Sequence, residues 1–361
     1  NNLSNRNLII NGAMLVAQRG TSSLANGIQT IDRFAYSSVS IDGSPTQAQA
    51  DVASGTTPYS LGFRKVFKVT NGNQTSGAQN ASLQQFSFRL EAQDIANSGW
   101  NYTDPNSKIT LSFWCKSSVS QNFFGFVNSI DGTSQQYPFE TGTLSADTWT
   151  KIIKVIPGNS NLQFDNDTNV GLRIYLGTFF GTDYTDSSVT LNAWGAYTSS
   201  ARTPVNTSTW YTTNDATFEL TGVQLEVGSV ATDFEHKSFA KELQLCKRYY
   251  QKSYSYPVVP GTASVNSGMI TSRYSDAVSN RMDLGTRFEV EMRSTPTVTI
   301  HRPFSGATGE LENFGSGNGT AAGNGRTFTM RGLGLKGFAG FTLGTNTGGT
   351  LGYHFQADAE I

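Results

Sequence analysis

Apolar and polar residues alternate along several short stretches in the first part of the chain. The clearest stretch is 109–116, and the same period of two recurs at 63–69, 86–92 and 172–176. In 109–116 one parity holds Ile109, Leu111, Phe113 and Cys115, and the other holds Thr110, Ser112, Trp114 and Lys116. Because successive side chains of a strand point to opposite faces, these stretches predict half-buried antiparallel strands.

The alternation changes parity near residue 222. Phe218 and Leu220 occupy even positions, whereas Val223 and Leu225 occupy odd positions. A strand that keeps one face in the core can absorb such a change by inserting one residue. The sequence therefore predicts a β-bulge at Gly222.

Turn residues separate the predicted strands. Asn11-Gly12, Asn26-Gly27 and Asn71-Gly72 are pairs that supply the positive φ angles of tight turns. Roughly ten strands over about 220 residues are typical of a two-sheet sandwich of the jelly-roll type. We expect this large jelly-roll domain to cover residues 1–233.

A different period follows residue 234. Apolar residues at spacings of 4, 3 and 4, which share one face of a helix, are Phe239, Leu243, Cys246 and Tyr250. We expect a short connecting helix within 234–252, with Ser238 as its N-cap. The apolar face either packs on a domain or forms a seam with other copies of the chain. In the second case the four residues are an oligomer interface.

Strand patterns return after Pro257 and Pro260. They predict a smaller, sandwich-like β domain over residues 253–361, with long glycine-rich loops that include 315–326. Since 234–252 holds the one convincing helical pattern, the predicted fold class is all-β.

Charge is scarce in this chain of 361 residues. Lys and Arg number 26 against 27 Asp and Glu, the formal net charge is −1, and charged residues make up 15%. Such a chain has no bulk attraction for nucleic acid or anionic lipid, so we expect neither as a partner. No apolar run is long enough to span a bilayer, and membrane insertion is not expected. The two cysteines, Cys115 and Cys246, fit core positions in a protein made in a reducing cytosol.

Catalytic and metal-binding signatures are not found in the sequence. The nucleophile motif G-x-S-x-G does not occur, and the histidines lie on separate elements. Asp165, Asp167 and Asn169 have the spacing of calcium ligands, but Val170 and Leu176 stand where an EF-hand needs Gly and Glu. We therefore predict no catalytic residues, no metal and no cofactor, while an irregular calcium site in that loop stays open.

Aromatic residues occur in polar, loop-like surroundings. The candidates for stacking on sugar rings are Trp100, Tyr102, Trp210 and Tyr211. Flat rings beside amides and hydroxyls suit glycan binding, because the rings stack on the sugar and the polar groups bind its hydroxyls. Alternatively, these rings cap the sandwich core or fill a subunit interface.

Several segments resemble bacteriophage and prophage tail-fibre proteins, which are receptor-binding virion proteins. The resembling segments are 7–14, 17–20, 31–34, 221–228, 233–236, 238–250 and 355–361. The segment 238–250 is the most specific of them, and together they bracket nearly the whole chain. Asp233 departs from the small residue or Pro that the pattern leads us to expect before Phe-Glu-His.

The resemblance implies a jelly roll like that of carbohydrate-binding modules, a connecting helix and a C-terminal β domain in a phage virion protein. It implies a homotrimer that contacts other virion proteins, attaches to host surface polysaccharide during adsorption and is synthesised in the bacterial cytoplasm. No catalytic residue is carried over, because the matching motifs look structural. Two alternatives stay open: a capsid-associated head fibre or decoration protein, and a glycan depolymerase. The chain begins at Asn1 rather than Met, and a preceding anchoring region stays open as well.

Overall fold

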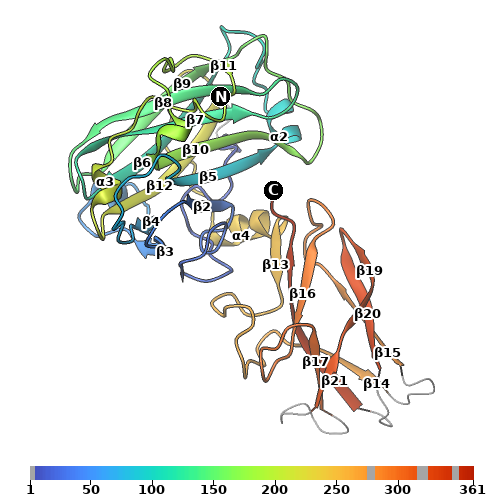
Figure 1. Cartoon of the computed structure of the whole chain (residues 1–361). Coiled ribbons are helices and arrows are strands. Elements are labelled where there is room, and N and C mark those ends of the chain that lie inside the picture. The colour runs from blue at the N-terminus through green and yellow to red at the C-terminus, as the bar shows by residue number, and fades with distance from the viewer. Residues whose placement is uncertain (1–4, 275–280, 315–323, 344–348) are drawn as a thin grey trace. The chain divides into compact units, whose positions relative to one another are not determined.

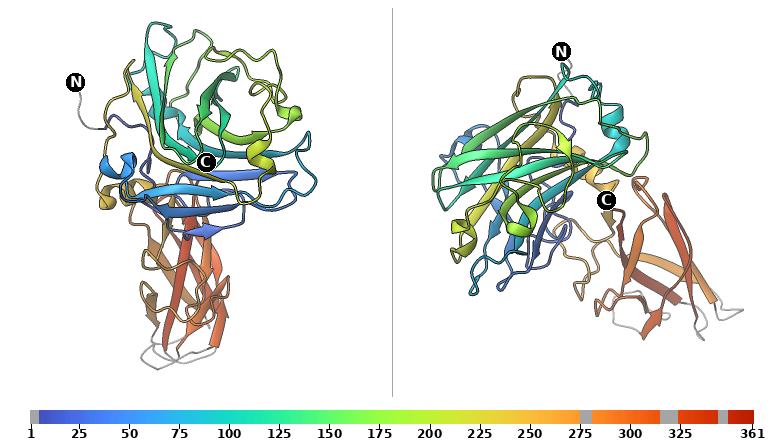
Figure 2. Two further views of the ribbon diagram at one scale, coloured as in Figure 1. Left: turned by 90° about the vertical axis from the view of Figure 1, so that its left-hand side faces the viewer. Right: turned by 45° about the horizontal axis from the view of Figure 1, so that its top comes forward.

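The computed structural model of the chain describes residues 5–274, 281–314, 324–343 and 349–361. The chain folds into two compact units (Figure 1 and Figure 2). The first comprises Asn1–Ala17, Thr21–Glu242 and Ile361, and the second comprises Gln18–Gly20 and Leu243–Glu360. The domain limits predicted at residues 233 and 252 stay a prediction.

The first unit is a sandwich of two antiparallel sheets, each with six strands. Across sheet A the order is β1 (Ser22–Ser23), β3 (Thr46–Asp51), β4 (Lys65–Thr70), β12 (Thr217–Val227), β6 (Lys108–Ser117) and β9 (Thr150–Pro157). Across sheet B it is β11 (Gly195–Ala196), β8 (Gln135–Leu144), β7 (Gln121–Ser129), β10 (Val170–Phe180), β5 (Leu83–Glu91) and β2 (Phe34–Val39). Short helices between strands are α1 (Thr57–Ser60), α2 (Ala92–Ala96), η1 (Thr182–Tyr184) and α3 (Thr209–Thr212). The prediction of an all-β fold with a large jelly-roll sandwich is confirmed.

Phenylalanine rings fill the space between the two sheets. Phe67 of β4 and Phe218 of β12 come from sheet A, and Phe86 of β5 comes from sheet B. The ring centroid of Phe86 lies 5.1 Å from that of Phe67 and 5.6 Å from that of Phe218. All three side chains are buried, and burying a ring of this size contributes about 2–3 kcal/mol. The apolar parity of β5, β6 and β10 is thus the parity that faces the core, as it is for Phe67 and Val69 of β4. Phe63 precedes β4 and packs in a separate cluster.

The predicted bulge is present in β12. Thr221 pairs with Trp114 and Gln224 pairs with Ser112, so Gly222 and Val223 together oppose one residue of β6. Gly222 has φ 62°, a left-handed conformation that glycine adopts without strain. The extra residue keeps the apolar side chains directed into the core on both sides of it.

The connecting helix α4 spans Phe239–Lys247, and Ser238 begins it as predicted, because its Oγ accepts the backbone N–H of Lys241 at 3.3 Å. Tyr250 lies beyond the helix, at the start of β13 (Tyr250–Lys252), where it pairs with Asp358. The expectation that Tyr250 extends the helical face is therefore wrong. No helix in the described ranges is long and apolar enough to cross a membrane.

The four predicted interface residues differ in exposure. Phe239 is exposed and Leu243 is half-buried, whereas Cys246 and Tyr250 are buried within the chain itself. Only the first two present surface to another copy. An oligomer interface at these residues stays a prediction.

The second unit is built on the long strand β21 (Gly349–Asp358). Its partners are β13, β14 (Ile270–Tyr274), β16 (Thr297–His301) and β17 (Glu310–Asn313), and β17 also pairs with β18 (Asn324–Thr327). A three-stranded sheet holds β15 (Arg281–Arg287), β20 (Gly337–Leu343) and β19 (Thr329–Gly334). The apolar core includes Leu311, Tyr353 and Phe355. Of the glycine-rich loop predicted over 315–326, residues 315–323 lie outside the described residues.

Replacing Gly222 with Ala tests the bulge. An added Cβ would lie 2.7 Å from Cζ of Phe63, so the variant meets both the left-handed backbone and a steric overlap. Gly142→Ala is the matched control, since Gly142 has φ 72° but no atom within 4 Å of the added Cβ. We expect the control to lose about 1 kcal/mol of unfolding free energy and Gly222→Ala to lose about 1–3 kcal/mol more.

Guanidinium unfolding followed by tryptophan fluorescence measures both losses. All 5 tryptophans lie in the first unit, so the signal reports its unfolding. Equal losses of unfolding free energy in the two variants would show that the position of Phe63 does not require a glycine at residue 222.

Candidate functional site

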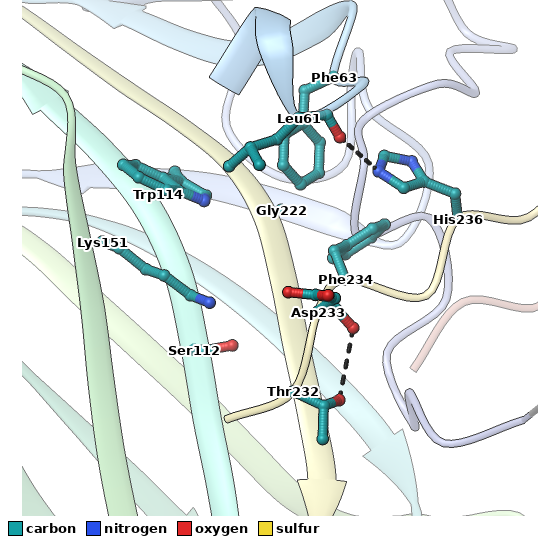
Figure 3. Close-up of a pocket in the computed structure, with 10 residues that line it drawn as sticks. All are labelled: Leu61, Phe63, Ser112, Trp114, Lys151, Gly222, Thr232, Asp233, Phe234 and His236. Atoms are coloured by element: carbon teal, nitrogen blue, oxygen red, sulfur yellow. Dashed lines mark hydrogen bonds between the residues drawn. The ribbon is translucent and has the colours of Figure 1, made fainter. Parts of the chain in front are cut away.

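A pocket of about 250 Å³ opens on the face of sheet A that is directed away from sheet B (Figure 3). Its floor comes from β6, β9 and the bulge of β12. Its sides come from the segment after α1 and from the segment 232–236 after β12. The lining residues are Leu61, Phe63, Ser112, Trp114, Lys151, Gly222, Thr232, Asp233, Phe234 and His236.

One wall of the pocket is aromatic. The ring centroids of Phe63, Phe234 and His236 lie 4.9–5.0 Å from one another. Nε2 of His236 donates a hydrogen bond to the carbonyl oxygen of Leu61 at 2.9 Å. This bond joins the segment 232–236 to the segment after α1, and the three rings pack as one group.

The opposite side of the pocket carries polar groups. Trp114 pairs with Lys151 across β6 and β9, so their side chains lie next to each other on the outer face. Figure 3 shows the indole nitrogen of Trp114, the amine of Lys151 and the carboxylate of Asp233 directed toward a common space beside Ser112. The side chains of these four residues form no hydrogen bond or ion pair with any described residue. The pocket therefore combines three donors and an acceptor, all without partners, with aromatic surface.

The bulge shapes the floor of the pocket. A Cβ at Gly222 would lie 2.7 Å from Cζ of Phe63 and 3.2 Å from Cδ1 of Trp114. The missing side chain therefore lets both rings approach the strand closely. Bulges are common beside functional sites, because they redirect neighbouring side chains.

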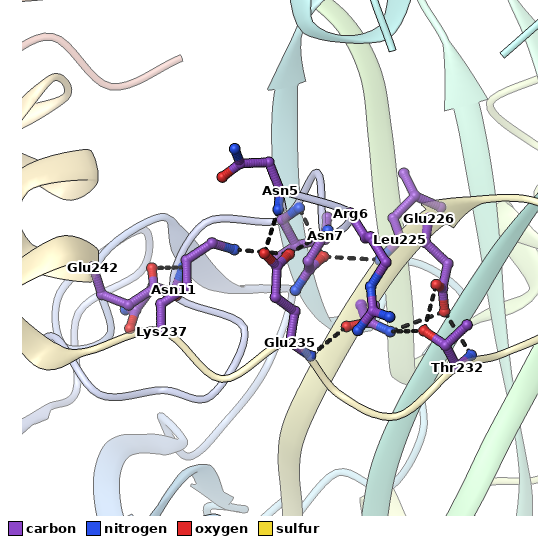
Figure 4. Close-up of polar contacts among 12 residues, drawn as sticks. Asn5, Arg6, Asn7, Asn11, Leu225, Glu226, Thr232, Glu235, Lys237 and Glu242 are labelled. Atoms are coloured by element: carbon purple, nitrogen blue, oxygen red, sulfur yellow. Dashed lines mark hydrogen bonds and ion pairs between the residues drawn. The ribbon is translucent and has the colours of Figure 1, made fainter. Parts of the chain in front are cut away.

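The segment 232–236 is held by polar contacts with β12 (Figure 4). The carboxylate of Glu226 accepts the backbone N–H of Thr232 at 2.9 Å and its hydroxyl at 2.6 Å. The backbone N–H of Glu235 donates to Oε1 of Gln224 at 2.8 Å, and Arg6 donates to the backbone carbonyl of Asp233 at 3.0 Å. These bonds position Asp233 while leaving its carboxylate free.

The N-terminal segment completes this network. Asn7 donates through Nδ2 to the carbonyl of Val223 at 3.0 Å and accepts the N–H of Leu225 through Oδ1 at 3.0 Å. The carboxylate of Glu235 accepts the N–H groups of Asn5 and Asn7 at 2.5 and 2.8 Å. The resembling segments 7–14, 221–228 and 233–236 thus meet in one hydrogen-bond network.

Two carboxyl groups in this region have opposite pKa shifts. Burial raises the pKa of Glu235, but the N–H donors of Asn7 and Asn5 and the charge of Lys237 outweigh burial and leave it below its usual value. Burial raises the pKa of Glu242, and the N–H of Asn11 and the charge of Lys237 offset this only in part. Glu235 is therefore stabilised as the anion, whereas the fold disfavours the anion of Glu242.

Three of the four aromatic residues proposed for glycan stacking lie inside the sandwich. Trp100, Trp210 and Tyr211 are 3%, 0% and 1% exposed. Trp210 donates through Nε1 to the carbonyl of Thr217 at 3.0 Å. Stacking on a sugar requires an open ring face, so these three side chains cannot act in that way. The expectation that Trp100, Trp210 and Tyr211 have exposed rings is wrong.

Tyr102 differs from the other three candidates. It is half-buried and meets the ring of Phe164 edge-on, with centroids 4.9 Å apart. Its role in glycan binding stays a prediction. The structure does not bring Tyr102 into the pocket of Figure 3.

The loop considered for calcium uses its polar groups internally. Asp167 accepts both the backbone N–H and the side-chain amide of Asn169, and Asp131 accepts the N–H of Asp165. In the described part of the chain, no three His, Cys, Asp or Glu residues gather closely enough to hold a metal ion.

Trp114 is the main site residue that the sequence reasoning missed. The alternation in 109–116 already places it on the face that does not pack in the core, among Thr, Ser and Lys. A tryptophan on the polar face of a predicted strand is unusual, and this position could have indicated a site residue. Lys151 offered none, because its position opposite Trp114 depends on the pairing of β6 with β9.

Comparisons with models of protein families and with curated proteins give no match. Among solved structures, the enzymatically active domain of tailspike protein 4 of bacteriophage CBA120 shares 11% identity at a TM-score of 0.31, covering 62% of this chain and 21% of that chain. A family 11 carbohydrate-binding module from Clostridium thermocellum shares 11% at 0.26, covering 59% and 99%. A xylan-binding domain from Paenibacillus barcinonensis shares 11% at 0.27, covering 60% and 96%. With scores this low, we assign the fold from its own strand order.

Exchanging each of the two carboxyl groups for an amide tests the network through its pH dependence. A lowered folded-state pKa contributes stability above the ordinary value of about 4.3, and that stability is lost as the pH falls through the folded pKa. Glu235→Gln is therefore expected to be less stable than the parent chain near neutral pH, with the difference shrinking in acid.

Glu242→Gln is the matched variant, for which a change in stability of the opposite sign is expected. A raised folded-state pKa costs stability at pH values above it, so this variant is expected to be more stable than the parent near neutral pH. Its advantage shrinks as the pH falls toward about 4.3. Unfolding midpoints from tryptophan fluorescence, measured from neutral pH to about pH 4, check both expectations. Shifts of the same sign would contradict the assignment.

Proposed function

We propose that this chain is a non-catalytic virion protein of the phage tail-fibre type that binds glycan on the host cell surface. Its resembling segments support the virion assignment, and the pocket on sheet A supports the binding role. The binding site is the pocket that contains Trp114, in place of the buried rings first considered.

The observation that carries the proposal is the combination of free polar groups and aromatic surface in one pocket. Sugars present apolar C–H faces together with many hydroxyls. The Trp114 ring supplies a surface for the C–H face. Asp233 accepts hydrogen bonds from hydroxyls, whereas Lys151 and the indole N–H donate to them. None of these groups has to break an existing bond within the described chain before it binds.

Charge and size favour a neutral sugar unit. The positive charge of Lys151 and the negative charge of Asp233 balance each other within the pocket. A volume of about 250 Å³ lies just below the usual range for small-molecule sites, which begins at about 300 Å³. The pocket suits a terminal or single sugar unit rather than a long enclosed segment.

The pocket favours binding over cleavage. Glycoside hydrolysis generally uses two carboxyl groups on opposite sides of the scissile bond. Asp233 is the one carboxylate among the lining residues, so the depolymerase alternative has no partner for it here. We therefore propose adsorption without hydrolysis.

Replacing Trp114 with Ala tests the site. Loss of the ring is expected to weaken binding to a neutral surface polysaccharide by at least about tenfold, as for a central aromatic contact. Trp149→Ala is the matched control, because Trp149 is also half-buried in the same apolar cluster but does not line the pocket. Immobilised, purified neutral polysaccharides and the full chain give the affinities. An equal loss of affinity in both variants, or no loss in Trp114→Ala, would show that the pocket is not the glycan-binding site.

Assembly is tested separately. A tail-fibre-type protein is expected to sediment as a trimer of about three times 39.0 kDa. Phe239→Lys should shift that mass toward one copy if the exposed end of α4 lies in the seam. Analytical ultracentrifugation at micromolar concentration gives the mass, and a stable single copy of the parent chain would count against the trimer. Labelling in purified particles distinguishes a tail from a capsid position.

A further inference from the structure

The outer face of sheet B, directed away from sheet A, carries a second set of polar groups without partners. Leu172, Ile174 and Leu176 of β10 point into the core. Because side chains alternate along a strand, Arg173 and Tyr175 between them point to the outer face. Both are half-buried. This face lies on the opposite side of the sandwich from the pocket.

Arginines lie side by side on this face. Arg173 of β10 pairs directly with Arg89 of β5. Arg33, which immediately precedes β2, donates to the backbone carbonyl of Arg89 at 2.7 Å. Like charges directly opposite each other on neighbouring strands destabilise a sheet. The guanidinium groups of Arg173 and Arg89 therefore repel each other, which favours an anionic group beside them.

Arg173 has no partner within the described chain. Its guanidinium forms no hydrogen bond or ion pair with any described residue, and its Nε is buried. On the other side of β10 it pairs with Asn128 of β7, and Asn128 pairs with Gln136 of β8. Gln136 is 6% exposed, and its Oε1 is also buried without a partner. Buried polar atoms without partners are rare in folded proteins and often mark a place for a ligand.

Acidic side chains on the same sheet do not neutralise Arg173. Glu91 follows Arg89 by two positions on β5, and its carboxylate is buried and accepts from Gln93. Glu140 of β8 accepts from Asn122. The positive charge of Arg173 is thus left for a group from outside the described chain.

An aromatic surface adjoins the arginine row. Tyr175 stacks on Phe126 of β7, with ring centroids 4.6 Å apart and planes 22° apart. The ring of Tyr197 is stacked near Phe126 as well, with ring centroids 6.3 Å apart and planes 29° apart. Tyr175 and Tyr197 keep part of their surface exposed. A ring surface beside a free guanidinium can hold a sugar and its charged substituent together.

We infer that this face binds an acidic glycan, with Arg173 holding a carboxylate or phosphate group and Tyr175 contacting the adjoining sugar. A guanidinium binds either oxyanion through two parallel N–H···O bonds, so the charge chemistry is shared. The inference does not rest on the pocket on sheet A. It adds a second binding face, which recognises a charged substituent, whereas the pocket binds a neutral sugar unit.

Calorimetric titration of the full chain at low ionic strength tests the inference. The probes are trigalacturonate and its fully methyl-esterified form, in which neutral esters replace the carboxylates on the same sugar chain, and a glycerol-phosphate trimer beside glycerol. We expect one of the acidic probes to bind and its neutral counterpart to bind at least tenfold more weakly. The acidic probe that binds identifies the substituent as carboxylate or phosphate.

Substitutions at Arg173 locate the site. Arg173→Ala is expected to weaken the acidic probe at least tenfold, and Arg173→Lys to restore part of the affinity through charge without the paired hydrogen bonds. Arg331→Ala in β19 removes the same charge from an exposed position in the second unit and is expected to leave binding unchanged. Trp114→Ala is likewise expected to leave it unchanged, which separates this site from the pocket.

Stability provides an independent readout. Because Arg173 faces Arg89 without a partner, Arg173→Gln is expected to unfold at the same or a higher guanidinium concentration than the parent chain. A lower midpoint would mean that Arg173 supports the fold, and the inference would fail. It would also fail if neither acidic probe binds, or if Arg173→Ala and Arg331→Ala bind the acidic probe equally well.

Discussion

The backbone groups of residues 223–226, which follow the bulge in β12, must find hydrogen-bond partners, because these residues are buried. Up to Leu220, β12 pairs with β4 on one side and β6 on the other. Beyond Gly222 the pairing with β4 ends, and the N-terminal segment takes its place. The N–H of Leu8 donates to the carbonyl of Leu225, and the N–H of Val223 donates to the carbonyl of Gly12. The sandwich, its N-terminus and the pocket floor all depend on this exchange of partners.

The pocket follows from the same constraint. Once the bulge has ended the pairing with β4, the chain after β12 turns back over the sheet and is fixed there by Glu226 and Gln224. That return brings Asp233 and Phe234 opposite Trp114 and Lys151. The pocket thus arises where the polar groups of one segment bind backbone positions and the neighbouring side chains stay without partners. This division between structural and free polar groups also distinguishes Arg173 from its neighbours on sheet B.

Much of the fold could be predicted from the sequence, because a strand with one buried face shows its period directly. The parity change at Gly222 even located the bulge. The end of α4 could not be found in this way, because Tyr250 continues the helical spacing and only its pairing with Asp358 makes it a strand residue. The burial of Trp210 could not be predicted from the sequence either. Polar neighbours in the sequence suggest a loop, but contacts with Thr217 and the core decide burial. The pocket required the order of the strands, which no local pattern contains.

The bond between Asn7 and Val223 closes a loop of 216 residues. During synthesis residues 5–14 leave the ribosome before the rest of the first unit, yet their partners on β12 and at Glu235 follow every other strand of that unit. Contacts so distant along the chain slow folding, because loop-closure entropy is lost before they form. The first unit therefore stays open along β12 until nearly all of its sequence has been translated. Closure of the sandwich, completion of the pocket floor and binding of residues 7–12 to β12 therefore all wait for the same strand.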